Sequence, residues 1–319
     1  MRESGFDRIV GASEEEERDV LAGFKNIFDT NYNIKGEKQK SPEQTRGAEA
    51  ISRYMFPFLE KYGVRALDIR PDQIHFMEKR DLPETVRKLY GDAGGVYEAD
   101  NQWILIFGGD QDPKTVLAKR MAHEMIHFNS FKSLTFNRDD CSAQGRRLGL
   151  QLKSGGFMHF RKLNEAITEE LAIRFAVEYF DKIEYTSDSI TAAREAYRPL
   201  IESGAKIISL TTSGMEADID LLERLDPNFT ESALSFGGET SYLSERAKLH
   251  QMIDDIFTKN KDKFKNKDEV FAIFVNAALK GRLLPLARIM NATYGKGSFS
   301  QLAEEMQEII NIEKTEKAA

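Results

Sequence analysis

The sequence has a single cysteine, Cys141, among its 319 residues, so it cannot form an internal disulfide bond. No apolar run approaches the roughly 18 residues that a membrane-spanning helix needs. The first residues contain no hydrophobic segment of the kind found in secretion signals. We therefore expect a cytoplasmic protein with no membrane partner, in which Cys141 is structural or incidental.

The chain also lacks an excess of positive charge. Its formal net charge is −7 at pH 7, which argues against a nucleic-acid partner and against binding to an anionic membrane surface. No internal repeat or low-complexity segment stands out. The length allows two or three subdomains that share a sizeable core.

Histidine is scarce as well, with five in the chain, yet two of them form the run His123-Glu124-Met125-Ile126-His127. Asp112 is a suitable N-cap for a helix, Pro113 suits its first position, and no glycine or proline follows before Asn129. Apolar residues surround the two histidines on nearly every side of this helix. The pattern predicts a buried helix.

The spacing of this run suits a metal site. Residues four apart lie one turn apart on one helix face, so His123 and His127 can bind the same ion. Glu124 lies about 100° round the helix and can reach a water on that ion without being a ligand. A chance match on a structural helix is the alternative, because a five-residue pattern alone gives false positives.

A catalytic zinc site takes three protein ligands and keeps one position open. A third histidine six residues after the second, with a glycine midway, is excluded because Ser133 and Ser130 stand there. The other source is a glutamate on a second helix, which we expect from about residue 163 to 181. Its Glu165 and Glu169 share one face with alanines that would allow close packing against the first helix. An ordinary amphipathic helix with exposed glutamates is the alternative.

Together, His123-Glu124-x-x-His127 and Asn164-Glu165-x-x-Thr168-Glu169 resemble the two motifs of gluzincins, the thermolysin-like zinc metallopeptidases, over roughly residues 94–180. The second motif of that group reads Asn-Glu-x-x-Ser-Asp, so this chain departs from it at Thr168 and Glu169. The connection between the motifs, residues 128–164, is also longer than in compact members. These departures affect the residues around the ligands more than the ligands themselves.

The resemblance implies a role for each matching residue. His123, His127 and Glu165 would be the ligands of one Zn²⁺ per chain, and Glu124 would be the general base. Asn164 and Glu169 would hold the second and the first histidine, respectively. Glu170, about 100° round its helix from Glu169, is expected to point elsewhere and to tolerate alanine.

The expected function is hydrolysis of a peptide or protein substrate by a zinc-activated water, with Glu124 taking the proton of that water. One alternative is a zinc-binding regulatory protein with a latent or inactive peptidase-like cleft. Another is a structural helical protein with a fortuitous motif. Metal content separates the last from the other two, and peptidase activity separates the first two. Specificity does not follow from the sequence.

A tetrahedral oxyanion would need a second electrophile, which the sequence does not identify. The candidates are Tyr242 and His159, followed by His250 and Tyr294. Residues of these types are more often packed in a core or exposed on a helix.

We expect an α+β fold of zincin type. A small mixed sheet and the active-site helix would form an upper subdomain above a helical lower one. Three regions are expected: a mainly helical N-terminal region at residues 1–90, a catalytic core at 91–185 and a helical C-terminal subdomain at 186–319. A hairpin at 94–107 would precede the motif helix. The resemblance to gluzincins implies that its second strand forms the rim of the cleft and binds extended peptide, and the alternative is a core strand of a small sheet. Residues 138–147 read as a polar connection. Other expected helices span 13–28, 42–63, 82–90, 191–208, 217–225, 242–258, 269–279, 285–294 and 299–312; short strands are expected at 74–76 and 157–160.

Overall fold

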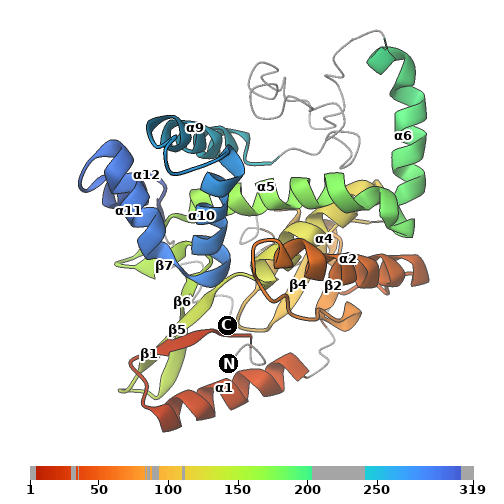
Figure 1. The fold of residues 1–319 in the computed structure, drawn as a ribbon. Coiled ribbons are helices and arrows are strands. Elements are labelled where there is room, and N and C mark those ends of the chain that lie inside the picture. Colours follow the sequence, from red (N-terminus) through yellow and green to blue (C-terminus); the bar gives the residue numbers. More distant parts are fainter. Residues whose placement is uncertain are drawn as a thin grey trace.

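A computed structural model describes residues 5–29, 36–82, 93–109, 112–202 and 241–309, together with Ile34, Glu84 and Arg87. The α+β class is confirmed (Figure 1). The expected helices at 82–90 and 217–225, and the end of the one at 191–208, lie largely or wholly outside the described residues. The described α-helices are α1 (Glu14–Asp29), α2 (Pro42–Glu60), α4 (Lys114–Phe128), α5 (Arg161–Tyr179), α6 (Glu184–Glu202), α9 (Leu243–Lys259), α10 (Lys267–Lys280), α11 (Leu283–Tyr294) and α12 (Ser298–Glu305).

The first of two mixed sheets has the strand order β2-β4-β3 and contains β2 (Ile74–Met77), β3 (Gly95–Glu98) and β4 (Trp103–Phe107). The expected hairpin is confirmed, since β3 and β4 pair in antiparallel fashion, while β2 runs parallel to β4. β4 therefore has a partner on both sides, and β3 is an edge. The expectation that β4 would form the rim of a cleft is wrong, because its backbone groups are already used by the sheet.

The second sheet has the order β1-β5-β6-β7-β8-β9. Its strands are β1 (Arg8–Val10), β5 (Lys132–Asn137), β6 (Ser142–Leu148), β7 (Gln151–Ser154), β8 (Phe157–His159) and β9 (Glu308–Ile309). Part of the expected polar connection at 138–147 is thus strand β6. Its middle residues are exposed and polar, and the ladder to β5 is irregular at Ser133 and Leu134, so the sequence has no clear alternation there.

Helix α4 is buried over almost its whole length, as its apolar surroundings predict. Its start differs from the expected one. Asp112 is not the N-cap, because its carboxylate accepts a hydrogen bond from the Gly109 N–H (2.8 Å), and Pro113 occupies the cap position without a side-chain bond. The Asp112 side chain thus stabilises the turn that precedes α4 and does not cap the N-terminus of the helix.

The C-terminal helices follow the expected ranges except at the end. Helix α12 stops at Glu305, and Glu308 and Ile309 then pair with β8. The expected helix to residue 312 is therefore wrong, because pairing with a distant strand leaves no local periodic signal.

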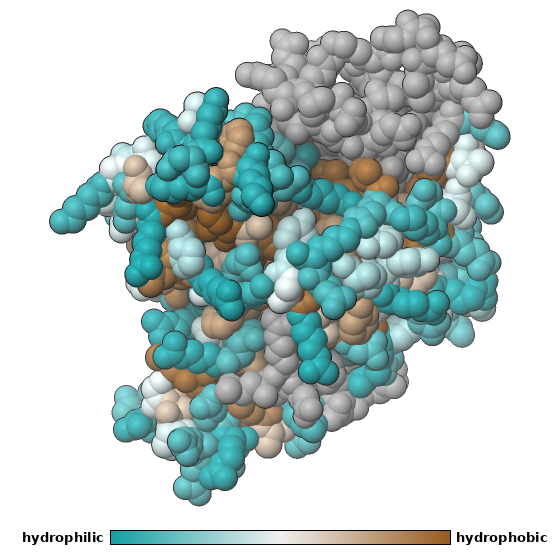
Figure 2. All heavy atoms as spheres, viewed as in Figure 1, coloured by the Kyte–Doolittle hydropathy of each residue, from teal (hydrophilic) through white to brown (hydrophobic). Residues whose placement is uncertain are grey.

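One hydrophobic core extends from Ala48 in α2 to Met306 after α12, and it includes residues of α4, α5 and α9. Helix α5 lies across the centre of the molecule, between α4 and the C-terminal helices (Figure 1). The face shown in Figure 2 is mainly hydrophilic, with hydrophobic residues visible between polar ones. The division into three regions remains a prediction. Among the described residues, we find no helix with the length and apolar content needed to cross a bilayer.

Candidate metal centre

The two motifs lie on α4 and α5, which pack against each other in the core. Alanines of α5 at positions 166, 172 and 176 are buried at this level and keep the helices close. As a result, the histidine face of α4 meets the glutamate face of α5.

Three candidate ligand atoms converge between these helices. His127 Nε2 lies 3.2 Å from His123 Nε2 and 3.1 Å from Glu165 Oε2, and His123 Nε2 lies 3.3 Å from the same oxygen. A tetrahedral zinc with bonds of about 2.0–2.1 Å separates its ligand atoms by roughly 3.3–3.4 Å. His123, His127 and Glu165 are therefore a group that could hold a metal ion.

The charges of this group also fit a cation. Burial opposes charging of His123, but hydrogen bonds with Glu165 and Glu169 outweigh it and raise the pKa of His123 to about 10. Burial likewise opposes charging of Glu165, and nearby His127 and His123 still hold the pKa of Glu165 well below its usual range. Without a metal, a proton on His123 thus supplies the positive charge that these side chains favour. A divalent ion would take the place of that proton.

The Glu169 carboxylate accepts a hydrogen bond from the other ring nitrogen of His123, Nδ1. The distance from His123 Nδ1 to Glu169 Oε2 is 2.9 Å, which is the contact expected for the longer residue at this motif position. This bond places a proton on Nδ1 when the imidazole is neutral and leaves the Nε2 lone pair directed at the metal position.

Sequence reasoning missed Lys119, which is buried and lies 2.5 Å from Glu169 Oε1 through its Nζ atom. Burial opposes ionisation of Glu169, but Lys119 and His123 lower the pKa of that carboxyl to about 2. The signal was present in the spacing: Lys119 stands four residues before His123, so it lies on the same helix face.

Asn164 does not contact His127 as the resemblance implied. Its Oδ1 accepts a hydrogen bond from the Leu150 N–H (2.8 Å), in the turn after β6. Among the described residues, His127 Nδ1 and Asn164 Nδ2 have no hydrogen-bond partner. Asn164 thus bonds the backbone of the longer connection and makes no hydrogen bond with His127.

Glu124 is buried beside the triad and lines a pocket of about 390 Å³. Burial and the charge of Glu165 raise the pKa of Glu124, although the two histidines and the Tyr97 N–H oppose the rise. A carboxylate with a raised pKa is suited to accept a proton near neutral pH. Gly95 on β3 leaves room for it, since a Cβ there would lie 2.9 Å from Glu124 Cγ.

Of the two principal electrophile candidates, Tyr242 lies at the site and His159 does not. The Tyr242 ring stacks on the ring of His123, with 6.1 Å between centroids and an angle of 18° between planes. Burial and the charges of Glu165 and Glu124 raise its pKa, so the phenol stays protonated and can donate a hydrogen bond.

The other candidates lie elsewhere. His159 pairs with Leu152 in the second sheet and does not line the pocket. His250 contacts Glu170 (2.9 Å), and the Tyr294 hydroxyl donates to Asp255 (3.1 Å).

The pocket is lined mainly by polar and charged side chains and by glycine backbone. Its lining residues are Ala93, Gly94, Gly95, Lys119, Arg120, His123, Glu124, Arg161, Glu169, Ser241 and Tyr242. A second pocket, of about 450 Å³, shares Ala93, Gly94 and Arg120 with it and extends past Gly108 and Gly109. The two pockets therefore adjoin at the start of edge strand β3.

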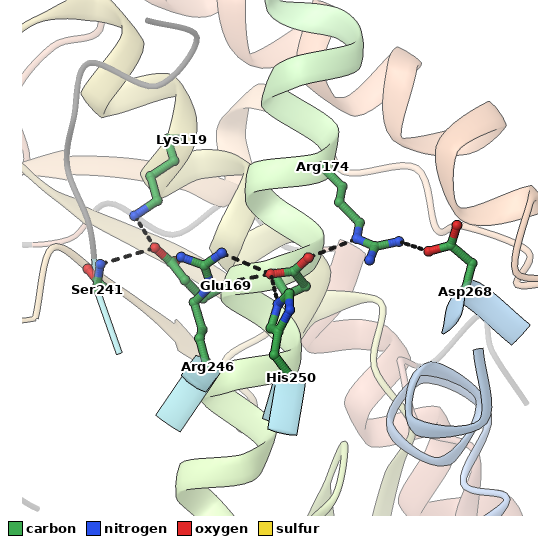
Figure 3. Close-up of polar contacts among 8 residues, drawn as sticks. Lys119, Glu169, Arg174, Ser241, Arg246, His250 and Asp268 are labelled. Carbon is green, nitrogen blue, oxygen red and sulfur yellow. Dashed lines mark hydrogen bonds and ion pairs between the residues drawn. The ribbon is translucent and has the colours of Figure 1, made fainter. Parts of the chain in front are cut away.

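Glu170 points away from the metal centre, as expected, but it is not a surface residue. It is buried and contacts Arg174, Arg246 and His250, each at 2.9 Å (Figure 3). We therefore expect Glu170→Ala to destabilise the fold, because it would leave the buried Arg246 uncompensated, while the expectation that zinc binding tolerates this change stays a prediction.

No family model, curated protein or solved structure matched this chain. The resemblance to gluzincins consequently depends on the two motifs alone.

Proposed function

We propose that this protein is a zinc-dependent peptidase in which His123, His127 and Glu165 hold one zinc ion. The observation that carries the proposal is the convergence of these three ligand atoms beside a buried glutamate at the wall of a pocket. A bound zinc ion would lower the pKa of a coordinated water and polarise a substrate carbonyl.

The side chains around the pocket supply the remaining steps. Glu124, with its raised pKa, accepts the proton of the attacking water and later donates a proton to the leaving amine. Tyr242 keeps its proton and donates a hydrogen bond to the oxyanion. Glu169 keeps the first histidine in the orientation and tautomer that a metal needs.

The position of edge strand β3 favours a peptide as the substrate. Gly94 O accepts a hydrogen bond from Phe107 N, so the backbone groups of alternate β3 residues face β4, whereas those of Gly95 and Tyr97 point away from it. The Tyr97 N–H donates a hydrogen bond to Glu124. An extended peptide lying along β3 could pair with the outward-facing groups of Gly95 and would pass beside Glu124, whose carboxylate already holds the Tyr97 N–H.

The decisive experiment compares wild type with Glu124→Gln on a mixed peptide library, with cleavage followed by mass spectrometry. Gln is nearly isosteric but cannot accept the proton, so we expect full zinc content and loss of cleavage. Cleavage by Glu124→Gln at the wild-type rate would refute the mechanism. Zinc binding without cleavage by either protein would instead favour a regulatory zinc protein with an inactive cleft.

A further inference from the structure

Helix α5 carries two adjacent buried carboxylates, Glu169 and Glu170, that face different neighbours. Glu169 faces α4, where it contacts His123 and Lys119. Glu170 faces the C-terminal helices, and one of its oxygens, Oε2, contacts α9 through both Arg246 and His250. The metal centre and the docking of α9 therefore depend on neighbouring residues of one helix.

The contacts to α9 are concentrated in its first half. Arg246 Nε and Nη2 donate to Glu170 Oε2 at 3.3 and 2.9 Å, and His250 Nε2 lies 2.9 Å from the same oxygen. Arg246 and His250 are one turn apart and share a helix face. Just before the helix, the Ser241 N–H donates to Glu169 Oε1 at 3.3 Å.

These contacts surround Tyr242, the N-cap of α9. Its backbone is left-handed (φ 56°), which is unfavourable for a tyrosine and needs support from its surroundings. Its side chain makes no capping hydrogen bond, so capping does not explain a tyrosine at this position. The first turn links it directly to the cluster, because Arg246 N donates to Tyr242 O (2.8 Å).

The other oxygen of Glu170 belongs to a different connection. Arg174 Nε donates to Oε1 at 2.9 Å, and Arg174 Nη1 donates to Asp268 of α10 at 2.9 Å. One carboxylate thus offers two separable contacts, of which only the Oε2 contacts lead to α9.

We propose that Glu170, Arg246 and His250 are positioning residues that hold α9 so that Tyr242 faces His123 in the pocket. Glu170 and the two α9 side chains do not line the pocket themselves. The effect on catalysis depends on the proposed peptidase function, whereas the placement of Tyr242 does not.

The placement can be tested without zinc or activity. Protein containing 3-fluorotyrosine should give ¹⁹F NMR signals from its ten tyrosines, and Tyr242→Phe identifies the signal of Tyr242. We expect Arg246→Met to shift or broaden that signal in metal-free protein. Arg174→Met is the matched control, because it removes a guanidinium from the same carboxylate without touching α9, and it should leave the Tyr242 signal in place. Should Arg246→Met fail to fold, His250→Gln and Arg246→Lys probe the same contact with a smaller change.

A double-mutant cycle tests the catalytic consequence. Arg246→Met should lower kcat on the order of tenfold through misplacement of Tyr242, with KM and zinc content little changed. In the Tyr242→Phe background it should have no further effect.

An unchanged Tyr242 signal in folded Arg246→Met would overturn the proposal, as would fully additive losses of kcat in the cycle. Absence of cleavage in wild type would refute the peptidase function alone, since the NMR comparison would still decide where Tyr242 lies.

Discussion

Lys119 and His123 share the Glu169 carboxylate, with Nζ 2.5 Å from one oxygen and Nδ1 2.9 Å from the other. A buried lysine thus offsets the charge of the residue that orients the first histidine. The properties of the candidate metal centre would therefore depend on a residue that is not one of its three candidate ligands.

Zinc content gives the most direct check of the ligand set. We expect near-stoichiometric zinc in protein purified without chelator, measured by elemental analysis, and loss of it in His123→Ala. Glu165→Ala should lose most of the zinc because its Oε2 completes the triangle with the two Nε2 atoms. Zinc retained undiminished in Glu165→Ala would mean that another residue is the third ligand.

Glu169→Ala should fold and bind zinc about 10- to 100-fold more weakly, the usual cost of losing the partner of a metal-bound histidine. Competition with a chromophoric chelator measures the change. Glu178→Ala is the matched control on the same helix, since Glu178 pairs with Lys61 at the surface. Equal affinities of Glu169→Ala and wild type would show that the His123 contact is irrelevant to binding.

Lys119→Met should move the acid limit of zinc binding to higher pH. Lys119 helps to hold the pKa of Glu169 at about 2, so without it the carboxyl takes up a proton at a higher pH and its hold on His123 is lost earlier. Zinc affinity measured from pH 7 down to pH 4 should therefore fall sooner in the variant. Superimposable wild-type and Lys119→Met curves would contradict this role.

Zinc affinity should also rise steeply with pH. The pKa of His123 is raised to about 10, so zinc must displace a proton at neutral pH. Because zinc displaces one proton, its affinity should increase as the pH rises toward 10, by about tenfold per pH unit. A histidine with an ordinary pKa near about 6.5 would give a plateau above neutrality. Titrations with a buffered zinc indicator between pH 6 and 9 distinguish the two.

Gly95→Ala should reduce cleavage on the order of 10- to 100-fold by displacing the general base, while zinc binding persists. The added Cβ would lie 2.9 Å from Glu124 Cγ and 3.1 Å from the Leu105 carbonyl, which belongs to the sheet and cannot yield. Gly145→Ala is the control, because a Cβ there meets nothing within 4 Å. Wild-type kcat/KM in Gly95→Ala would show that Glu124 has more room than the structure indicates.

Glu170→Ala should lower the free energy of unfolding by roughly 3–5 kcal/mol, because it leaves buried Arg246 without its carboxylate. The cluster around Glu170 holds its pKa below the usual value, so its contribution is present above about pH 4 and is lost as pH falls further. Urea unfolding of wild type and Glu170→Ala at pH 7 and at pH 3 measures both effects, because the difference between the two proteins should shrink at the lower pH. A loss under about 1 kcal/mol at pH 7 would contradict the role of the cluster in stability.

The candidate ligands could be predicted because both motifs are local. Helical spacing alone places His123 and His127 on one face, and the Glu165–Glu169 spacing does the same on α5. The contact of Glu169 with His123 was predicted from the resemblance to gluzincins, which assigns this position to the first histidine. The contact of Asn164 was not predicted, because its actual partner, Leu150, comes from a turn whose position depends on the second sheet.

The second sheet itself was largely missed. Strand β6 has polar, exposed residues on much of its length, and β9 is two residues long and pairs with a strand far away in the sequence. Neither leaves a periodic apolar signal. The role of Arg246 was equally out of reach, since only the packing of α9 on α5 shows which residues of that helix are buried.

Strands β1 and β9 form the two opposite edges of the second sheet. During synthesis from the N-terminus, both histidines, Glu165 and the whole of α5 leave the ribosome before the last strand of this sheet, β9, exists. The group that could hold the metal can therefore assemble on a nascent chain whose sheet still has an open edge at β8. The contacts between α4 and α5, which place the three candidate ligands together, can therefore form while α9 and β9 are still being made.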